Sequence, residues 1–390
     1  MHRVTLVFIL FLLIPDLYIY LVYVVRKTRK AVLHCLYWLP TLLLAAGYVY
    51  FIFLTGDNAM SNHTQAIGRL AITIMLFVFP KTIFMLCSLV GVLAHFIIRR
   101  CPRSPFTAIG LVLAVVSFFN ILYGTLAGIT RFDTKEVEYR SANIPEGFDG
   151  YRIVQISDIH IGSWQGNPEP IKQLVDLVNG QKPDLIVLTD LVNQQSHELD
   201  GFQEILSQLY APDGVYSILG NHDYGSYYHW QSPKAEIANL DYLIRQQKAM
   251  GWKLLNNEHD ILHHKGDSIA LIGVENDGEP PFSQFANLPQ AMQGTEGMFQ
   301  ILLSHNPTHW RREVLPQSDI SLMLAGHTHA MQGILFGHSL AELIYPEWRG
   351  MYYEGKRALY VNIGIGYVGL PFRFGAWPEI TVLKLVREKE

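Results

Sequence analysis

The sequence YRIVQISDIHIG, residues 151–162, is the stretch that decides the fold of this chain. Its first half, residues 152–156, is short and rich in branched apolar side chains, which is typical of a buried strand. Asp158 and His160 follow on alternate positions. Because alternate side chains of an extended chain lie on the same side, these two could hold one metal ion. The simpler alternative for Asp158 is that it caps a turn.

Four later apolar runs end in the same kinds of residue. The runs at residues 185–189, 215–219, 299–303 and 320–325 lead, in order, into Asp190 with Asn193, into Asn221, His222 and Asp223, into His305, and into His327 with His329. In open α/β sheets, binding sites gather beyond the carboxyl ends of strands. These strand ends therefore indicate one shared metal site rather than scattered polar turns.

The region from residue 131 to residue 390 alternates between strand and helix patterns. Helices are predicted at residues 168–179, 198–209 and 232–250, and further strands at 131–139, 252–255 and 268–274. The strand at 131–139 is expected at a sheet edge, and residues 359–362 and 380–385 are expected to form a last strand pair. Mixed strands and helices around one site predict an α/β fold, a two-sheet sandwich.

The motifs D-x-H, D-x-x-N, G-N-H-D, S-H-N-P and G-H-T-H together resemble the calcineurin-like metallophosphoesterase family. Within that family, the chain is most similar to the YkuE-type, membrane-attached bacterial branch. The resemblance extends from residue 143 to the C-terminus and includes Asn362, Arg373 and Glu379. It implies the two-sheet metallophosphoesterase sandwich.

The resemblance also implies a role for each site residue. One divalent metal ion would be held by Asp158, His160 and His329, the other by Asn221, His305 and His327, and Asp190 would bridge the two. His222 would act on the leaving group without binding metal, and the possible substrate contacts are Asn193, Asp223 and Arg373. Carboxylate, amide and imidazole ligands without thiolates suit Mn, Fe, Zn or Co.

Two positions depart from the family pattern. Thr189 directly precedes Asp190, where the family has glycine, and Asn193 stands where many members have aspartate. The first departure concerns the local geometry of the bridging residue, and the second concerns the orientation of His222.

The first 130 residues differ in composition from the rest of the 390-residue chain, which is 49% hydrophobic with a net charge of -4. Four apolar segments, at residues 4–25, 31–54, 70–98 and 106–129, are each long enough to cross a bilayer. Residues 1–130 are therefore predicted to form a four-helix transmembrane region. The alternative, a buried soluble helix bundle, fits less well because the segments are so long.

Basic residues give an expected orientation. They lie in the first and third loops, as Arg26, Lys27, Arg29 and Lys30, and as Arg99, Arg100 and Arg103, whereas residues 55–68 contain no Lys or Arg. The positive-inside rule then places both basic loops in the cytoplasm of a bacterial cell. The catalytic domain is expected on the outer face of the inner or cytoplasmic membrane.

Two charged residues interrupt the apolar segments, and each follows a proline. Asp16 follows Pro15 in the first segment, and Lys81 follows Pro80 in the third. Charges inside a membrane usually face a partner or a cavity. Counted along their helices, the two lie at similar depth, which predicts an ion pair. Helix breaks that admit water at the prolines are the alternative.

The expected activity is hydrolysis of a phosphomonoester, phosphodiester or pyrophosphate bond in a lipid or envelope substrate. The bilayer and a phosphorylated lipid or small molecule are the expected partners, and no basic run suits nucleic acid. The aromatic residues 224–230, with His309 and Trp310, could line an apolar wall. Two alternatives remain: a UDP-2,3-diacylglucosamine-type pyrophosphate hydrolase, whose substrate would be cytoplasmic, and a non-catalytic membrane sensor.

Overall fold

The computed structural model describes residues 2–388 apart from 54–55, 57 and 59–61. The chain divides into two compact units. A helical unit contains residues 1–127 and 369–372, and a catalytic unit contains residues 128–368 and 373–390. Each unit is described separately.

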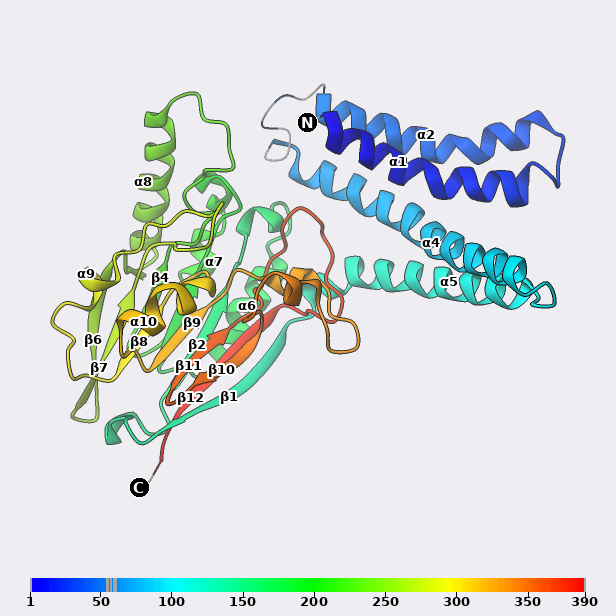
Figure 1. The fold of residues 1–390 in the computed structure, drawn as a ribbon. Helices are drawn as coiled ribbons and strands as arrows, with labels where there is room; N and C mark the ends of the chain where they lie inside the picture. Colours follow the sequence, from blue (N-terminus) through cyan, green and yellow to red (C-terminus); the bar gives the residue numbers. More distant parts are fainter. Residues whose placement is uncertain (1, 54–55, 57, 59–61, 389–390) are drawn as a thin grey trace. The chain divides into compact units, whose positions relative to one another are not determined.

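The helical unit is built from long apolar helices (Figure 1). They are α1 (His2–Ile19), continued by the π-helix η1 (Tyr20–Val24), α2 (Ala31–Phe53), α4 (Thr64–Ile97) and α5 (Ser104–Leu126). Among the described residues, α2, α4 and the segment that begins with α5 are long and apolar enough to cross a membrane, and Ile9–Val24 forms a shorter apolar helix. Within the described residues, the four predicted apolar segments therefore lie largely in helices, and residue 54, at the end of the second, falls outside the described residues.

Helices α4 and α5 approach each other closely at two glycines. A Cβ atom added to Gly91 would lie 2.8 Å from the Cβ of Phe106, and one added to Gly110 would lie 2.8 Å from the Cβ of Cys87. Small residues let apolar helices pack backbone against backbone where no hydrophobic effect drives them together.

Asp16 and Lys81 form the predicted ion pair in the helical unit. The Nζ atom of Lys81 lies 2.7 Å from Oδ1 of Asp16. Tyr37 donates a hydrogen bond of 3.0 Å to the same oxygen, and Thr41 donates to Oδ2. Helices α1 and α4 continue through Pro15 and Pro80. The ion pair is confirmed, and the helix breaks are not observed.

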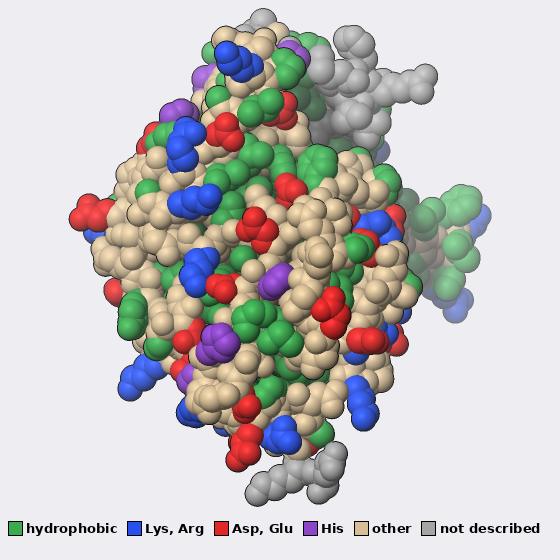
Figure 2. Space-filling view, turned by 90° about the vertical axis from the view of Figure 1, so that its left-hand side faces the viewer, with side chains coloured by type: hydrophobic (Ala, Val, Ile, Leu, Met, Phe, Trp, Pro, Cys, Tyr) green, Lys and Arg blue, Asp and Glu red, His purple; other side chains and the backbone are tan. Residues whose placement is uncertain are grey.

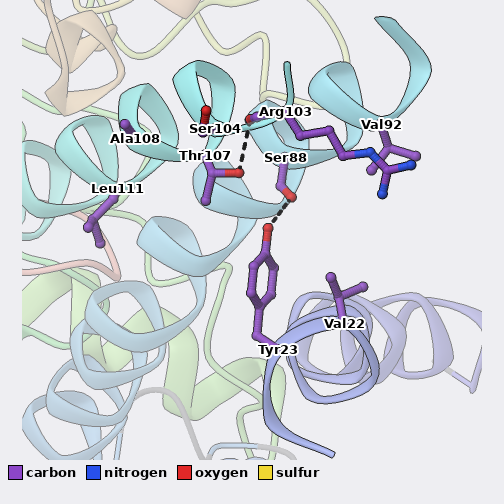
Figure 3. A pocket seen from close by; sticks show the side chains of 9 residues that line it. All are labelled: Val22, Tyr23, Ser88, Val92, Arg103, Ser104, Thr107, Ala108 and Leu111. Atoms are coloured by element: carbon purple, nitrogen blue, oxygen red, sulfur yellow. Dashed lines mark hydrogen bonds between the residues drawn. The ribbon is translucent and has the colours of Figure 1, made fainter. Parts of the chain in front are cut away.

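A pocket of about 530 Å³ lies within the helical unit (Figure 3). It is lined by side chains from η1, α4 and the start of α5, with Arg103 among them. The hydroxyl groups of Tyr23 and Ser88 are hydrogen-bonded at 2.7 Å inside it. None of the predicted metal ligands lines this pocket.

The catalytic unit contains two six-stranded sheets (Figure 1). Sheet A has the order β1 (Asp133–Ser141), β12 (Glu379–Arg387), β2 (Arg152–Ser157), β3 (Leu185–Thr189), β4 (Val215–Ile218) and β5 (Lys253–Leu254). Sheet B has the order β10 (Gly350–Glu354), β11 (Arg357–Val361), β9 (Leu322–Ala325), β8 (Gln300–Leu303), β7 (Asp267–Gly273) and β6 (Glu258–His264). Strand β1 is at a sheet edge, as predicted.

Alternating side chains build the layers of this unit. In β2, Ile153 enters the core between the sheets, whereas Val154 enters the core beneath α6 (Glu169–Gly180). The outer face of sheet A is covered by α6, α7 (Gln203–Leu206) and α8 (Pro233–Ala249), and that of sheet B by α9 (Leu288–Met292) and η6 (Trp310–Val314) with α10 (Leu315–Gln317). The predicted two-sheet α/β sandwich is confirmed.

Two predictions about local structure are wrong. Strands β11 and β12 do not pair, because β11 lies between β10 and β9 in sheet B and β12 lies between β1 and β2 in sheet A. The segment between them is long enough to pass from one sheet to the other. The helix predicted at residues 198–209 is divided into η5 (Ser196–Leu199) and α7, because Gly201 has a φ of 87° that no helix accommodates.

The central strands of both sheets run parallel. In sheet A, β2, β3, β4 and β5 are parallel, and in sheet B, β7, β8, β9 and β11 are parallel. The carboxyl ends of parallel strands meet at one edge of each sheet, which is where polar sites gather. On the face shown in Figure 2, charged side chains of both signs are interspersed among the described residues.

Candidate metal centre

Strand β2 delivers Asp158 and His160, although not in the way that was predicted. The strand ends at Ser157, and the two residues have φ values of 50° and 45°, so the backbone there is left-handed rather than extended. Their side chains still converge, with Nε2 of His160 lying 3.9 Å from Oδ1 of Asp158. Strand alternation is therefore not what brings these two side chains together, although the expected proximity is observed.

Left-handed backbone occurs at five of the seven predicted ligands. Positive φ values between 45° and 76° occur at Asp158, His160, Asp190, His327 and His329. Such a conformation costs a non-glycine residue on the order of 1 kcal/mol or more. Residues of this kind cluster at functional sites. The surrounding structure thus holds these side chains in place at a cost to stability.

One group of ligand atoms gathers around Asp158. Its Oδ1 atom lies 3.3 Å from Nε2 of His329, and the Nε2 atoms of His160 and His329 are 3.0 Å apart. All three residues are buried. These three are the set predicted for the first metal ion.

A second group gathers around Asn221, which follows β4. The Oδ1 atom of Asn221 lies 2.9 Å from Nε2 of His305 and 2.9 Å from Nδ1 of His327. Those two histidine nitrogens are 3.2 Å apart. These are the three residues predicted for the second ion.

Asp190 lies between the two groups. Its Oδ2 atom is 3.6 Å from Nε2 of His160 and 3.7 Å from Nε2 of His305. Asp158 also reaches towards the second group, with Oδ1 3.9 Å from the same nitrogen of His305. Two carboxylates, rather than the single predicted one, therefore lie at the junction.

The donor set fits divalent metal ions. The Oδ2 atom of Asp190 is buried and has no hydrogen-bond partner, although buried carboxylate oxygens are normally paired. Neutral imidazoles and carboxylates converge around it, and this is the ligand chemistry that Mn, Fe, Zn and Co accept. The clusters Asp158–His160–His329 and Asp158–Asp190–His305 each have the spacing of a metal site.

Other residues fix the orientation of the histidine rings. The carbonyl oxygen of Val192 lies 3.3 Å from Nδ1 of His160, and Tyr345 contacts Nε2 of His327 at 3.1 Å. A carbonyl can only accept, so Nδ1 of His160 carries the proton and Nε2 presents a lone pair to the centre. Partners of this kind set both the tautomer and the direction of a ligand.

The structure accommodates the departure at Thr189. This residue ends β3, and its hydroxyl group lies 3.0 Å from Nδ1 of His305. Asp190 follows in the left-handed conformation and still reaches the centre. Thr189 therefore supports a predicted ligand, a contact that a glycine would lack.

His222 is oriented by backbone. Its Nδ1 atom donates to the carbonyl oxygen of Asn193 at 2.6 Å. The Asn193 side chain is engaged elsewhere, because Oδ1 accepts from the backbone N–H of Ser163 and Nδ2 donates to its hydroxyl. His222 is partly exposed, and its spacing to His160 and Asp190 would also permit metal binding.

Asp223 and Arg373 have no surface open to a substrate. Asp223 is fully buried and accepts three backbone hydrogen bonds, from Leu191, Val192 and Gly220. Arg373 is also fully buried; it donates to three carbonyl oxygens and to Nδ1 of His329. All three side chains predicted as possible substrate contacts thus make their hydrogen bonds within the protein, and the partner of Asn193 is Ser163.

The glycines of two motifs are explained by close packing. A Cβ atom on Gly220 would lie 2.4 Å from the Asp190 side chain, and one on Gly326 would lie 2.5 Å from Oδ2 of Asp158. Such distances are shorter than any real carbon contact. A larger residue at either position would displace a carboxylate of the centre.

Burial dominates the protonation equilibria. It lowers the pKa of His222 and of His305 to about 4 and places that of His160 well below its usual range. Burial raises the pKa of Asp190 well above its ordinary value, and the charges of Asp223 and Asp158 add to the effect. These three imidazoles are therefore neutral, which is the form that binds metal.

Asp158 differs from Asp190. Burial alone would raise its pKa, but His329 and His305 nearby hold the pKa well below the ordinary value. Two carboxylates in one buried site thus have pKa values displaced in opposite directions, a pattern that is common at functional sites.

Several site residues were not predicted from sequence. Tyr345 contacts His327, and the Phe282 ring meets the His327 ring edge-on with centroids 4.5 Å apart. Both come from segments without a recognisable motif. The predicted aromatic wall is only partly right: Tyr224 and Tyr227 line a pocket beside Asn221, but His309 and Trp310 are fully buried. Trp310 packs in the core against sheet B instead, and His309 is hydrogen-bonded to Ser304 and Glu313.

The fold and the centre define a class of protein. A two-sheet α/β sandwich that gathers carboxylate, amide and imidazole groups at the carboxyl ends of parallel strands is a metal-binding hydrolase architecture. Residues 151–331 match the family described as "Calcineurin-like phosphoesterase", and residues 2–129 match "Probable Calcineurin-like phosphoesterase, transmembrane domain". The chain belongs to the calcineurin-like metallophosphoesterase family and is a membrane protein.

Curated relatives agree with this placement. The chain is 34% identical to the metallophosphoesterase YkuE of Bacillus subtilis, over 65% of this chain and 85% of that protein. It is 31% identical to a transmembrane protein with metallophosphoesterase domain from Danio rerio, over 72% of this chain but only 62% of that protein's length. A metallophosphoesterase of Helicobacter pylori is 28% identical over 90% of this chain and 89% of its own.

Proposed function

We propose that this chain hydrolyses a phosphoester bond with the help of two divalent metal ions. The observation that carries the proposal is the convergence of seven ligand-type side chains in two groups, with Asp190 between them and its Oδ2 atom buried and unpaired. Asp158, His160 and His329 would hold one ion, and Asn221, His305 and His327 the other. Asp190 would contact both.

Ions bound there would stabilise negative charge on the phosphoryl oxygens and favour ionisation of the attacking water. The protein's own groups do the positioning. Val192, Thr189 and Tyr345 fix the rings of the ligand histidines, while Gly220 and Gly326 leave room for the carboxylates. A site that is organised before the substrate arrives pays little reorganisation energy during the reaction.

His222 is the proposed catalytic side chain outside the ligand set. Its Nδ1 atom is held by the carbonyl oxygen of Asn193, so Nε2 is the atom available to the leaving oxygen. Asp223 would support this segment through its backbone hydrogen bonds, and Arg373 would support His329. We therefore assign Asp223 and Arg373 to positioning rather than to substrate contact.

The substrate is proposed to be a phosphorylated lipid or another envelope phosphoester. A chain with several membrane-type helices and an active-site pocket with aromatic side chains supports this class. We further propose that the catalytic unit lies outside the cytoplasm, since the seven basic residues of two loops favour that orientation. A reporter that is active only outside the cytoplasm should work when fused after Glu390 and be silent at Thr28.

The test of the activity uses the purified full chain and an aryl phosphodiester. Turnover should be abolished by a chelator and restored by added Mn, Fe, Zn or Co, with about two equivalents of metal bound at full activity. A rate that is indifferent to the chelator would mean that the activity does not belong to this centre.

A further inference from the structure

A pocket of about 570 Å³ adjoins the metal centre. It is formed by α8, by the residues that follow β4, and by segment 281–285. Asn221 belongs to both the pocket and the centre. Any ligand in this pocket therefore lies directly beside the predicted metal ions.

Two aromatic side chains connect the pocket to the centre. The ring of Tyr227 lies 4.8 Å from that of His222, and the ring of Phe282 lies 4.5 Å from that of His327. His222 is the residue proposed to act on the leaving oxygen. The pocket thus opens on the side from which the leaving group departs.

Most of the remaining lining side chains are apolar, with Ser226, Glu236 and Ser283 as the polar exceptions, and several of the apolar ones are exposed to solvent. Ile237 is 62% exposed, Phe285 is 50% exposed and Tyr227 is 48% exposed, with Leu240 and Pro281 beside them. Large apolar side chains grouped in one concave place usually mark a binding site, because covering them removes apolar surface from water.

We propose that this pocket binds the hydrocarbon part of a lipid leaving group, so that the substrate is a phosphoester of a lipid alcohol. This inference rests on the proposed function. In the reaction, the phosphorus–oxygen bond to the lipid alcohol breaks and a bond from phosphorus to the water oxygen forms. The alcohol oxygen takes up the proton that the water gives up. The released alcohol then leaves through an apolar pocket.

Tyr227 has a second role in this arrangement. The Nδ2 atom of Asn221 donates to the Tyr227 hydroxyl at 2.8 Å, which leaves Oδ1 of Asn221 facing His305 and His327. Without that acceptor, the amide loses the contact that distinguishes its oxygen side from its nitrogen side. Tyr227 is thus a positioning residue for the second metal ion as well as a wall of the pocket.

The experiment compares alkyl phosphates of increasing chain length, with the full chain held in an amphipathic polymer free of lipid. The kcat/KM value should rise roughly fourfold for each added methylene until the pocket is filled. Calorimetry with non-hydrolysable alkyl phosphonates should show the same increase in affinity, which gives a readout independent of turnover.

Two variants separate the two roles. Ile237→Asn should flatten the dependence on chain length while leaving the affinity for metal unchanged, and Ala238→Asn, on an exposed part of α8 outside the pocket, is its control. Tyr227→Phe keeps the ring but removes the hydroxyl. It should lower the affinity of one metal ion by about 10- to 100-fold and retain the dependence on chain length.

Each result is decisive. A flat chain-length series with intact metal-dependent hydrolysis overturns the lipid pocket and leaves the proposed function standing. A preference for aryl over long alkyl phosphates would identify an aromatic leaving group instead and overturn the lipid assignment. If alkyl phosphonates bind with the expected dependence but no ester is hydrolysed, the proposed function fails and the pocket stands. Unchanged metal affinity in Tyr227→Phe overturns the positioning role.

Discussion

Asp16 in the helical unit and Asp190 in the catalytic unit are both 1% exposed, but their surroundings differ. Asp16 receives a cation, Lys81, and two hydroxyl donors, so both of its oxygens are paired. The Oδ2 atom of Asp190 has no hydrogen-bond partner, and its neighbours at 3.6 and 3.7 Å are neutral imidazoles. Among the described residues, one buried carboxyl group is thus paired with a cation, whereas the other lacks one and has a raised pKa because of its burial.

This difference distinguishes a buried carboxylate with a structural role from one with a functional role. A buried charge that is paired within the chain fixes how its helices pack, and removing one partner leaves the other unpaired. A buried carboxylate without a partner costs folding free energy, and only a ligand from outside can recover it. The place where the protein tolerates that cost is where a cation is expected to bind.

The substitution with the largest expected effect on this difference between Asp16 and Asp190 is Asp190→Asn. The substitution keeps the shape but removes the charge, so both metal ions should be lost and activity should fall by roughly 10⁴-fold or more. Metal analysis and the aryl phosphodiester assay measure this, with Asp176→Asn, exposed on α6, as the control. The metal-free variant should also melt at a higher temperature than metal-free wild type. A lower melting temperature would mean that the charge is already compensated.

The next effect concerns His222, which lies next to Asn221 but is proposed not to bind metal. His222→Ala should retain near-normal metal content while turnover falls by about two to four powers of ten. The loss should be smaller for substrates with acidic leaving groups, which depart without a proton. His197→Ala, at an exposed position, is the control. Loss of metal in His222→Ala would make this residue a ligand, as its spacing to His160 and Asp190 permits.

Much of this architecture could be predicted because it is encoded locally. The runs before Asp158, Asp190 and His327 are short and apolar, and the parallel strands that they form bring their ends together. The Asp16–Lys81 pair was also predictable, because helical rise converts sequence distance into depth.

Other features depend on long-range packing and left no local signal. The left-handed backbone of Asp158 and His160 goes with hydrogen bonds from their segment to residues 189–191, at the end of β3 and just beyond it. Tyr345 and Phe282 reach His327 from loops without a motif. The assignment of β11 and β12 to different sheets likewise depends on tertiary contacts rather than on periodicity.

The opposite case in the comparison is tested by a double-mutant cycle on Asp16 and Lys81. Lys81→Met leaves a buried carboxylate unpaired and should cost about 3–5 kcal/mol of unfolding free energy. Asp16→Leu should also cost stability, because it leaves the Lys81 ammonium group without its counterion inside an apolar segment. The double variant should be more stable than the sum of the single losses implies. Additive losses would argue against the pair, and Arg69→Met, exposed on α4, is the control.

A third buried carboxylate, Glu198, lies between these two extremes. Its Oε2 atom accepts backbone hydrogen bonds from Asn193 at 2.6 Å and Gln194 at 3.2 Å, and no cation in the described part of the chain pairs with it. Burial raises the pKa of Glu198 to about 7, and the charge of Asp223 contributes.

Glu198 predicts the smallest effect, and its sign follows from the raised pKa. Between about pH 4.5, where the unfolded chain loses this proton, and about pH 7, the folded protein retains it. The unfolded state therefore binds fewer protons in this window, and stability falls as the pH rises, by up to about 3 kcal/mol in total. Glu198→Gln keeps an acceptor oxygen but no charge.

The melting temperature of Glu198→Gln should match that of wild type at the acidic end of the window and exceed it by several degrees above pH 7. Glu204→Gln, on the exposed side of α7, should leave the pH profile unchanged. If Glu198→Gln and wild type lose stability in parallel, the Glu198 charge is compensated within the fold. Glu198 would then belong with Asp16 rather than with Asp190.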